Sequence, residues 1–250
     1  MLLLAIPHIA SAEDKKPDPA KALPHVIMTL PLALSRGTTT TIILRGQGLA
    51  NATEVSAETE NASLRVKIKS KGKADLPKPE LLEKMGDTQV EVELKIPEDA
   101  PGDQIKLTIV TPNGTSETRA IPIYKPGDLV ADKEPNGGFH NAQEVQLPAT
   151  LIGTIGKENA VHVFRISAKA GQKISAGVTA AKLGSALDSL LTIYDEHGEV
   201  VAANDDADAD SPDSHLNVTL PHDGVYYISL TDAQGNGGAM YPWLLHITAD

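Results

Sequence analysis

The 250-residue chain contains no cysteine. Disulfide bonds, zinc sites built from thiolates and catalysis by a cysteine nucleophile are therefore excluded. Because many exported bacterial proteins also lack cysteine, this absence says nothing about the compartment in which the protein works.

Aromatic residues are scarce as well, at 3% of the chain, with one Trp, two Phe and five Tyr. The 41% of residues that are hydrophobic must therefore build packed cores mainly from Val, Ile, Leu and Ala. The shortage of rings also weighs against a carbohydrate-binding module, because sugars usually bind on exposed aromatic faces. The length suffices for one large or two ordinary domains.

Basic residues are outnumbered by acidic ones. Lys and Arg total 22, Asp and Glu total 33, and the formal net charge is −11. A surface of that charge repels a phosphate backbone, so nucleic-acid binding is not expected. No apolar run approaches the length needed to cross a bilayer, so no transmembrane anchor is expected either.

The amino terminus carries the pattern of an export signal. An apolar run ends in Ala10-Ser11-Ala12, and the charged, proline-containing stretch from Glu13 follows at once. An A-x-A ending before such a stretch predicts a signal peptide, residues 1–12, although no Lys or Arg precedes the apolar run. Residues 13–23 are expected to form a flexible leader. The expected location is secreted, periplasmic or in the cell envelope.

Residues 24–123 are predicted to form a first all-β unit. The β-branched run Thr38–Leu44 predicts a strand, and the glycines of residues 45–49 predict a turn after it. An Asn-Gly pair at Asn113-Gly114, between two apolar runs, predicts a hairpin. The polar stretch 69–87 is predicted to be an insertion that contains one helical turn.

Residues 124–130 are the predicted linker, and residues 131–250 are predicted to form a second all-β unit. Short strands with regular glycine turns favour a sandwich or jelly roll over a parallel sheet. Alternation of apolar and polar residues shows which side chains face inward. These are Ile174, Ala176 and Val178, Leu216, Val218 and Leu220, Tyr226, Ile228 and Leu230, and Trp243, Leu245 and Ile247.

A series of sequence elements runs in order through this second half. They are Lys133-Glu134-Pro135-Asn136, Val163-Phe164-Arg165-Ile166, Leu187-Asp188-Ser189-Leu190-Leu191, Asn204-Asp205-Asp206 and Asp223-Gly224-Val225-Tyr226-Tyr227-Ile228. Together they resemble the bacterial pre-peptidase C-terminal domain, a module often found after the catalytic unit of secreted proteases. The resemblance implies a jelly-roll β-sandwich, similar to the collagen-binding domains of clostridial collagenases.

The first half carries elements of a different kind. They are Arg36-Gly37-Thr38, Leu44-Arg45-Gly46-Gln47-Gly48-Leu49 and Val110-Thr111-Pro112-Asn113-Gly114. These elements resemble an IPT/TIG immunoglobulin-like domain, although similar glycine and threonine patterns recur in many unrelated sandwiches. The predicted fold is therefore all-β, with an immunoglobulin-like sandwich followed by a jelly-roll sandwich.

The resemblance of the second half to the pre-peptidase C-terminal domain also implies a candidate calcium site. Calcium needs six to eight oxygen ligands, which relatives take from an acidic segment that begins the domain and from aspartates farther on. Asp132, Glu134 and Asn136 keep the alternating oxygen donors of the first segment, and Glu158 lies near the second. His162 stands where an aspartate is expected, which would weaken calcium binding. A lone histidine of this kind is more often structural than a ligand.

A second acidic stretch has some of the spacing of a calcium loop. Asp206, Asp208 and Asp210 copy the first three ligand positions of an EF-hand, but Ser211 replaces the required glycine and no bidentate Glu closes the loop. A solvated turn is the preferred interpretation. Asp195 is expected to cap a neighbouring turn, since Asp side chains bond to nearby backbone amides.

No active-site motif is present, whether G-x-S-x-G, H-E-x-x-H or a phosphate-binding glycine loop, so catalysis is not predicted. The predicted function is a secreted, noncatalytic binding or adhesion protein at the cell surface or matrix. Its partner would be a protein or matrix polymer, with Tyr227 as an exposed contact. Three alternatives remain open: an accessory or targeting partner of a secreted peptidase, a carbohydrate-binding module, and an enzyme of unfamiliar type.

Overall fold

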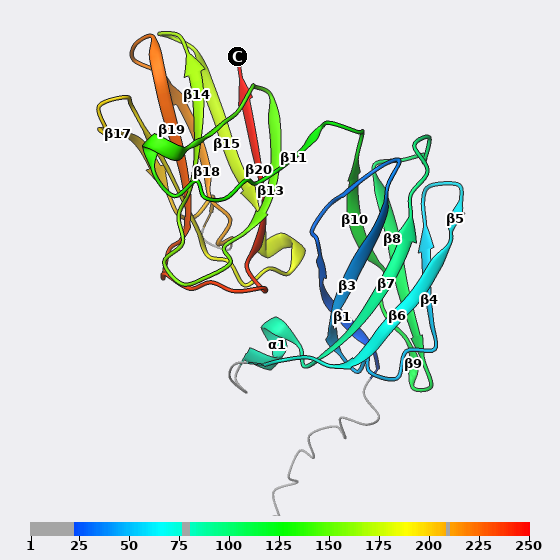
Figure 1. The fold of residues 1–250 in the computed structure, drawn as a ribbon. Coiled ribbons are helices and arrows are strands. Elements are labelled where there is room, and N and C mark those ends of the chain that lie inside the picture. The colour runs from blue at the N-terminus through cyan, green and yellow to red at the C-terminus, as the bar shows by residue number, and fades with distance from the viewer. Residues whose placement is uncertain (1–22, 77–80, 209–210) are drawn as a thin grey trace, which may run out of the picture.

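The computed structural model describes residues 23–76, 81–208 and 211–250, and the described chain forms two β-sandwiches (Figure 1). The all-β prediction is confirmed. The predicted signal peptide, nearly all of the predicted leader and Asp210 lie outside the described residues. The turn 125–128 joins the sandwiches. Tyr124, Leu129 and Val130, which were placed in the linker by sequence, belong to strands at its two ends.

The first sandwich is built from two facing sheets. Their strand orders are β1-β3-β7-β6 and β2-β10-β8-β4-β5, with β9 paired to β8. This arrangement corresponds to the two sheets of an immunoglobulin fold, with a parallel β2–β10 pair at one edge. The elements are β1 (His25–Leu30), β2 (Leu34–Ser35), β3 (Thr39–Gln47), β4 (Glu54–Glu58), β5 (Ser63–Leu64), β6 (Val66–Lys73), α1 (Leu82–Met85), β7 (Thr88–Lys95), β8 (Gln104–Thr111), β9 (Gly114–Thr115) and β10 (Arg119–Tyr124).

The glycine-containing segment 45–47 is not the turn that the sequence predicts. It continues β3: Arg45 and Gly46 pair with Gln89 and Thr88 of β7, and Gln47 pairs with His25 of β1. Gly46 is required there, because a Cβ at this position would lie 1.9 Å from the carbonyl oxygen of His25. Close packing of β1 against β3, rather than a chain reversal, explains this glycine.

The segment 69–73 was predicted to belong to an insertion, but it is the second half of β6. This strand pairs with β7 and lies at the edge of its sheet. Its outward positions are mostly lysine, as is common on edge strands, so its sequence does not look like a strand. The helical turn predicted farther along is α1, and the hairpin at Asn113-Gly114 joins β8 to β9.

The second sandwich is a jelly roll. Strands β13 to β20 form two sheets, with the orders β13-β20-β15-β18 and β14-β19-β16-β17, and successive strands change sheet except for the β16–β17 hairpin. Strands β11 and β12 add parallel edges. The elements are β11 (Leu129–Ala131), η3 (Phe139–Asn141), β12 (Gln143–Glu144), β13 (Ala149–Thr154), β14 (His162–Ala168), β15 (Lys173–Thr179), η4 (Ala181–Leu183), β16 (Ser189–Tyr194), β17 (Val200–Asn204), β18 (His215–Thr219), β19 (Gly224–Asp232) and β20 (Pro242–Ala249).

The two cores differ in composition. The first is wholly aliphatic, whereas Phe164, Tyr226 and Trp243 are completely buried in the second. The rings of Phe164 and Trp243 meet edge to face with centroids 5.8 Å apart, a favourable geometry for aromatic pairs. The side chains predicted to face inward all pack in this second core, and only Val218 among them is partly exposed.

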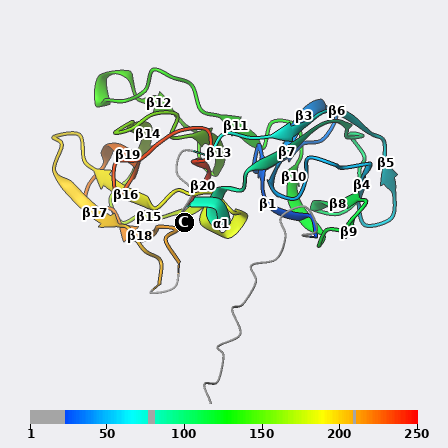
Figure 2. The same cartoon turned by 90° about the horizontal axis from the view of Figure 1, so that it is seen from below.

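A third apolar cluster lies between the sandwiches. Met28, Leu32 and Met85 of the first unit contact Met240 and Leu244 of the second. Figure 2 shows α1 at this junction. The fit is close, because a Cβ on residue 184, a glycine next to η4, would lie 2.1 Å from a carbonyl oxygen of β1. The two units therefore pack directly on one another and are not linked by the turn alone.

Candidate functional site

Three titratable side chains meet where the chain enters the second sandwich. Asp132 follows β11, and its backbone N–H donates to the carbonyl oxygen of Ile152 in β13 (2.9 Å). His162 begins β14, and its Nδ1 lies 2.7 Å from Oδ2 of Asp132. With one carboxylate oxygen of Glu134, the candidate ligand atoms all lie within 4.8 Å of one another. We call this group the acid–histidine cluster.

The acid–histidine cluster includes two of the four residues predicted to bind calcium. Asn136 joins through its Nδ2, which donates to Oδ1 of Asp132 (2.8 Å). Glu158 is exposed and is not a member. His162 lies beside the predicted calcium residues, as expected from its strand position. Whether calcium binds there stays a prediction.

Several polar atoms of this region lack hydrogen-bond partners. His162 and Asn136 are each 1% exposed, whereas Glu134 is at the surface. Asn136 Oδ1 accepts no hydrogen bond from any described residue. Although His162 Nδ1 is close to Asp132, its direction does not satisfy a hydrogen bond, and Nε2 has no partner among the described residues. Such buried atoms are rare and call for an explanation.

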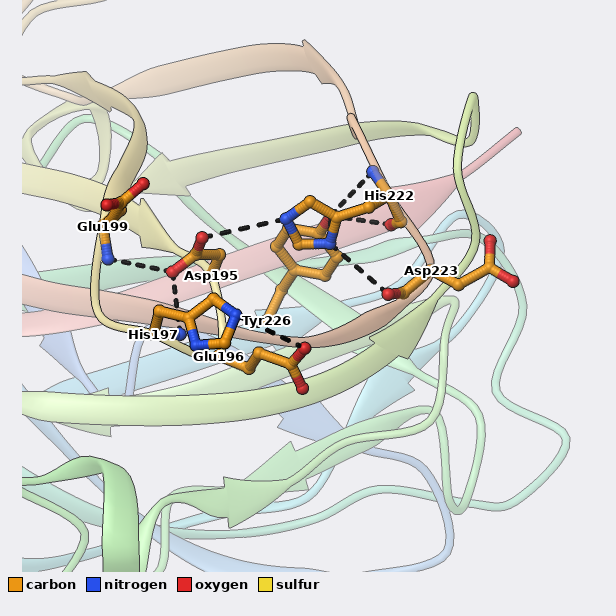
Figure 3. A network of polar contacts seen from close by, with 7 residues as sticks. All are labelled: Asp195, Glu196, His197, Glu199, His222, Asp223 and Tyr226. Atoms are coloured by element: carbon orange, nitrogen blue, oxygen red, sulfur yellow. Dashed lines mark hydrogen bonds and ion pairs between the residues drawn. The ribbon is translucent and has the colours of Figure 1, made fainter.

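A second Asp–His pair connects two turns of the same sandwich (Figure 3). Asp195 Oδ1 accepts the backbone N–H groups of His197 and Glu199, both at 2.9 Å, which confirms its predicted role in a turn. Asp195 Oδ2 lies 3.7 Å from Nε2 of His222. The bond from the Glu199 amide is the main cause that lowers the pKa of Asp195, and burial opposes it only in part.

Tyr226 fixes the other side of this network. Its hydroxyl donates to the carbonyl oxygen of His222 (2.8 Å) and lies 3.1 Å from Nδ1 of the same histidine. The two rings stack with centroids 5.4 Å apart. A tyrosine that bonds to backbone a few residues upstream is a known stabilising feature of β-sandwiches. Because these groups are satisfied by one another, we interpret the network as structural.

The acidic loop between β17 and β18 has exposed and buried carboxylates. Asp206 and Asp208 are exposed. Asp213 is 1% exposed and accepts three backbone N–H groups at η4, from Ala180 (3.0 Å), Ala181 (2.8 Å) and Lys182 (3.2 Å). The sequence analysis missed Asp213, because only the tertiary fold brings it to η4.

Three aromatic side chains gather on the outer face of the second sandwich. Tyr194 of β16 and Tyr227 of β19 are directly opposite one another. Phe139 of η3 stacks on Tyr227, with ring centroids 4.3 Å apart and planes 10° apart, and lies 5.3 Å from the ring of Tyr194. Phe139 is 36% exposed and both tyrosines are partly exposed. We call these three residues the outer aromatic cluster.

Only Tyr227 of the outer aromatic cluster was identified from the sequence. Tyr194 could have been found from strand parity, because it follows the inward-facing Ile193. No sequence pattern shows that η3 folds back over the sheet, and this fold-back is what places Phe139 in the cluster.

A cleft of about 610 Å³ lies between the two sandwiches. Ile27, Lys84 and Met85 line it from the first unit, and Asp188 and Tyr241 line it from the second. Burial raises the pKa of the Tyr241 hydroxyl, with a smaller contribution from the charge of a nearby aspartate. The walls therefore mix apolar and polar groups.

A serine and a histidine are hydrogen-bonded on the outer face of the opposite sheet. Ser175 Oγ lies 3.1 Å from Nε2 of His215, which is exposed. Within the described residues, no carboxylate pairs with this histidine, so the arrangement lacks the orienting acid of a catalytic triad. Nearby, His246 Nδ1 lies 3.2 Å from Thr150 Oγ1, and burial lowers the pKa of His246.

Part of the second sandwich matches a known domain family. Residues 160–232 match the bacterial pre-peptidase C-terminal domain. This match confirms the resemblance predicted for the second half, and the domain is of a noncatalytic kind. The IPT/TIG resemblance of the first half is not confirmed and stays a prediction.

A curated protease is similar to about half of this chain. A probable subtilase-type serine protease of Deinococcus radiodurans is 32% identical over 124 residues, which are 49% of this chain and only 16% of the relative. The chain therefore spans a small part of that protease. No described helix has the length and apolar character that a membrane crossing requires.

Two solved structures are similar at low identity. The pre-peptidase C-terminal domain of a Bacillus anthracis collagenase is 15% identical and covers 43% of this chain and 94% of its own, with a TM-score of 0.35. PliG of Aeromonas hydrophila, a periplasmic inhibitor of g-type lysozyme, is 16% identical and covers 49% of this chain and 98% of its own, also with a TM-score of 0.35. Likenesses this weak carry no information about a partner.

Proposed function

We propose that this protein is an exported, noncatalytic binding protein whose pre-peptidase C-terminal domain holds a protein or matrix polymer through the outer aromatic cluster. The observation that carries the proposal is the position of Phe139, Tyr194 and Tyr227. Three of the eight aromatic residues of the chain gather on one sheet face, where none of them is needed to fill a core.

Aromatic side chains at a surface favour binding for a physical reason. They bury a large apolar area while few rotatable bonds are immobilised, and Tyr in particular is enriched at binding hot spots. Arg165 lies directly opposite Tyr227 in the neighbouring strand β14 and pairs with Glu144 (2.5 Å). The cluster therefore has a charged rim on one side, as binding surfaces usually do.

The ring geometry favours a polypeptide over a sugar. The rings of Phe139 and Tyr227 stack with their centroids 4.3 Å apart, so each ring covers one face of the other. The cluster therefore presents a compact apolar protrusion and not a broad, open aromatic surface. A carbohydrate-binding module remains the alternative that a glycan-binding result would support.

The similarity to a probable subtilase-type serine protease supports a second candidate. Because the matching region of the Deinococcus radiodurans relative belongs to a probable serine protease, the same surface can serve an accessory that targets a separate secreted peptidase. Export itself rests on the predicted signal peptide. Calcium stabilisation through Asp132, Glu134, Asn136 and Glu158 is a separate prediction that does not depend on the aromatic surface.

The experiment that tests the proposal measures binding of the full chain to immobilised fibrillar collagen, gelatin and peptidoglycan, with a glycan array in parallel. Phe139→Ala and Tyr227→Ala are compared with Val161→Ala. Val161 is a fair control, because it is 37% exposed and Phe139 is 36% exposed, yet it lies outside the cluster.

Each aromatic substitution is expected to weaken binding by about 30-fold, the effect of a typical hot-spot residue, while Val161→Ala leaves it unchanged. Equal binding by all three variants would reject the cluster as the contact surface. Binding to glycans alone would support the carbohydrate-binding alternative instead.

A further inference from the structure

The acid–histidine cluster has the donor atoms of a transition-metal site. Calcium prefers oxygen ligands throughout, whereas an imidazole nitrogen with carboxylate oxygens suits zinc and its neighbours in the first transition row. Asp132, Glu134 and His162 supply two carboxylates and one imidazole. We propose that they bind a divalent transition cation, zinc in particular, in preference to calcium.

The unpartnered buried atoms point to a ligand at this position. His162 is 1% exposed and lies against Asp132, yet neither of its ring nitrogens makes a hydrogen bond to a described residue. A buried polar group without a partner costs free energy. A cation between the imidazole and the carboxylates would give Nδ1 of His162 a partner and would also neutralise the two acidic groups.

The distances are close to those that zinc requires. Two ligands bound to zinc at about 2.1 Å in a tetrahedral arrangement lie about 3.4 Å apart. The His162 Nδ1 to Asp132 Oδ2 distance is 2.7 Å, so the two atoms need to separate by less than the length of one bond. Glu134 is exposed, and its side chain can close on the ion from outside.

Asn136 can add a further oxygen to the site. Its Nδ2 now donates to Asp132 Oδ1 at 2.8 Å, while its Oδ1 has no partner among the described residues. Rotating the amide by half a turn exchanges these two atoms and directs Oδ1 toward Asp132. An oxygen facing a carboxylate is favourable only with a cation present, so metal binding is expected to reverse this amide.

Packing holds the site in place from behind. A Cβ on Gly153 of β13 would lie 2.3 Å from Cζ2 of Trp243 and 2.8 Å from Cβ of Asp132, so both residues press on this glycine. The ring of Trp243 is in turn 5.6 Å from that of His162. A bound metal would therefore link residues 132–134, which follow the interdomain turn, to β14 of the second sandwich.

The test titrates the full chain, without an affinity tag and after removal of metal, with Co²⁺, Zn²⁺ and Ca²⁺. Trp243 is the only tryptophan and its ring lies 5.6 Å from that of His162, so its fluorescence reports on this site. Co²⁺ is expected to quench Trp243, Zn²⁺ to displace Co²⁺ and restore the emission, and Ca²⁺ to leave the quenching unchanged. Zn²⁺ is also expected to raise the melting temperature by mass action.

Two carboxylate variants separate a zinc site from a calcium site. Glu134→Gln removes an exposed ligand without disturbing the core, and is expected to weaken Zn²⁺ binding by at least about 100-fold, since even outer partners contribute 10- to 100-fold. Glu158→Gln is the matched control and is expected to bind Zn²⁺ normally. Asp132→Asn is expected to behave like Glu134→Gln.

Three results would overturn the zinc assignment. They are absence of Trp243 quenching by Co²⁺, unchanged Zn²⁺ affinity in Glu134→Gln, and displacement of Co²⁺ by Ca²⁺ with a loss of affinity in Glu158→Gln. The last result would establish the calcium site predicted from the sequence. None of them affects the outer aromatic cluster, because that surface lies on a different set of residues.

Discussion

The two sandwiches have similar architectures but very different aromatic contents. Tyr124, in the last strand of the first sandwich, is its single aromatic residue, and the other seven of the eight lie in the second. Of those seven, three fill the core, three form the outer aromatic cluster and Tyr241 lines the interdomain cleft. In a chain this poor in rings, this uneven distribution is the reason that the proposed binding surface is placed on the second sandwich.

The contrast between the cores gives the largest expected effects. Phe164→Ala in the second core is expected to lower the free energy of unfolding by about 3–5 kcal/mol, because it removes a ring and leaves a cavity. Leu94→Ala in the aliphatic core of the first sandwich is expected to cost about 2–5 kcal/mol. Both residues are completely buried. Urea unfolding, followed by circular dichroism for the whole chain and by Trp243 fluorescence for the second sandwich, measures both effects.

The same two variants show whether the sandwiches unfold together. Because Met28, Met85 and Leu244 pack across the junction, Leu94→Ala is expected to lower the midpoint of the Trp243 transition as well. A Trp243 transition that Leu94→Ala leaves unmoved would show that the two units unfold independently in spite of the apolar contact.

A smaller effect is expected from the tyrosine that connects the core to the turns. Tyr226→Phe keeps the ring but removes the hydroxyl that donates to the carbonyl oxygen of His222 at 2.8 Å. The expected loss is about 1 kcal/mol in the free energy of unfolding, the usual contribution of one hydrogen bond. Tyr227→Phe, on the neighbouring outward position, is the control and is expected to change stability by less than about 0.5 kcal/mol.

The smallest expected effect is on the pH dependence of stability. It is tested by comparing a buried histidine with an exposed one. Burial lowers the pKa of His246, so the folded protein takes up this proton less readily than the unfolded chain does. Above the ordinary histidine pKa of about 6.5 the residue is neutral in both states, and stability is lost as the pH falls below that value. His246→Gln is expected to flatten the decline in melting temperature between pH 7 and pH 5.

The exposed His215 provides the comparison for this pH dependence. It lies on the same outer sheet face, one strand beyond β15 from His246. The variant His215→Gln is expected to keep the decline of the wild type. An unchanged decline in His246→Gln would contradict the assignment to the buried residue.

The sequence was most informative where alternation decides burial. Ile174, Tyr226 and Trp243 were placed in the core because alternate apolar residues of a strand share one face. The second half of β6, residues 69–73, was assigned to an insertion because an edge strand can be mostly lysine. Residues 45–47 were assigned to a turn, whereas Gly46 serves close packing. Local patterns do not separate these cases.

The candidate sites were less predictable, because they depend on contacts between distant segments. Asp132 and His162 are 30 residues apart, and their meeting was anticipated through the family resemblance and not through spacing. The position of Phe139 depends on how η3 lies over the sheet, and that of Met240 depends on the packing of the two sandwiches. Neither contact leaves a periodic signal in the sequence.

The measurement that tests the central proposal most directly is the comparison of Phe139→Ala with Val161→Ala in binding to immobilised collagen, gelatin and peptidoglycan. The two side chains are equally exposed, so a general loss of surface hydrophobicity would affect both variants alike. If the outer aromatic cluster is the contact surface, Phe139→Ala loses about 30-fold in affinity and Val161→Ala loses none. Equal affinities for the two variants would contradict the proposal.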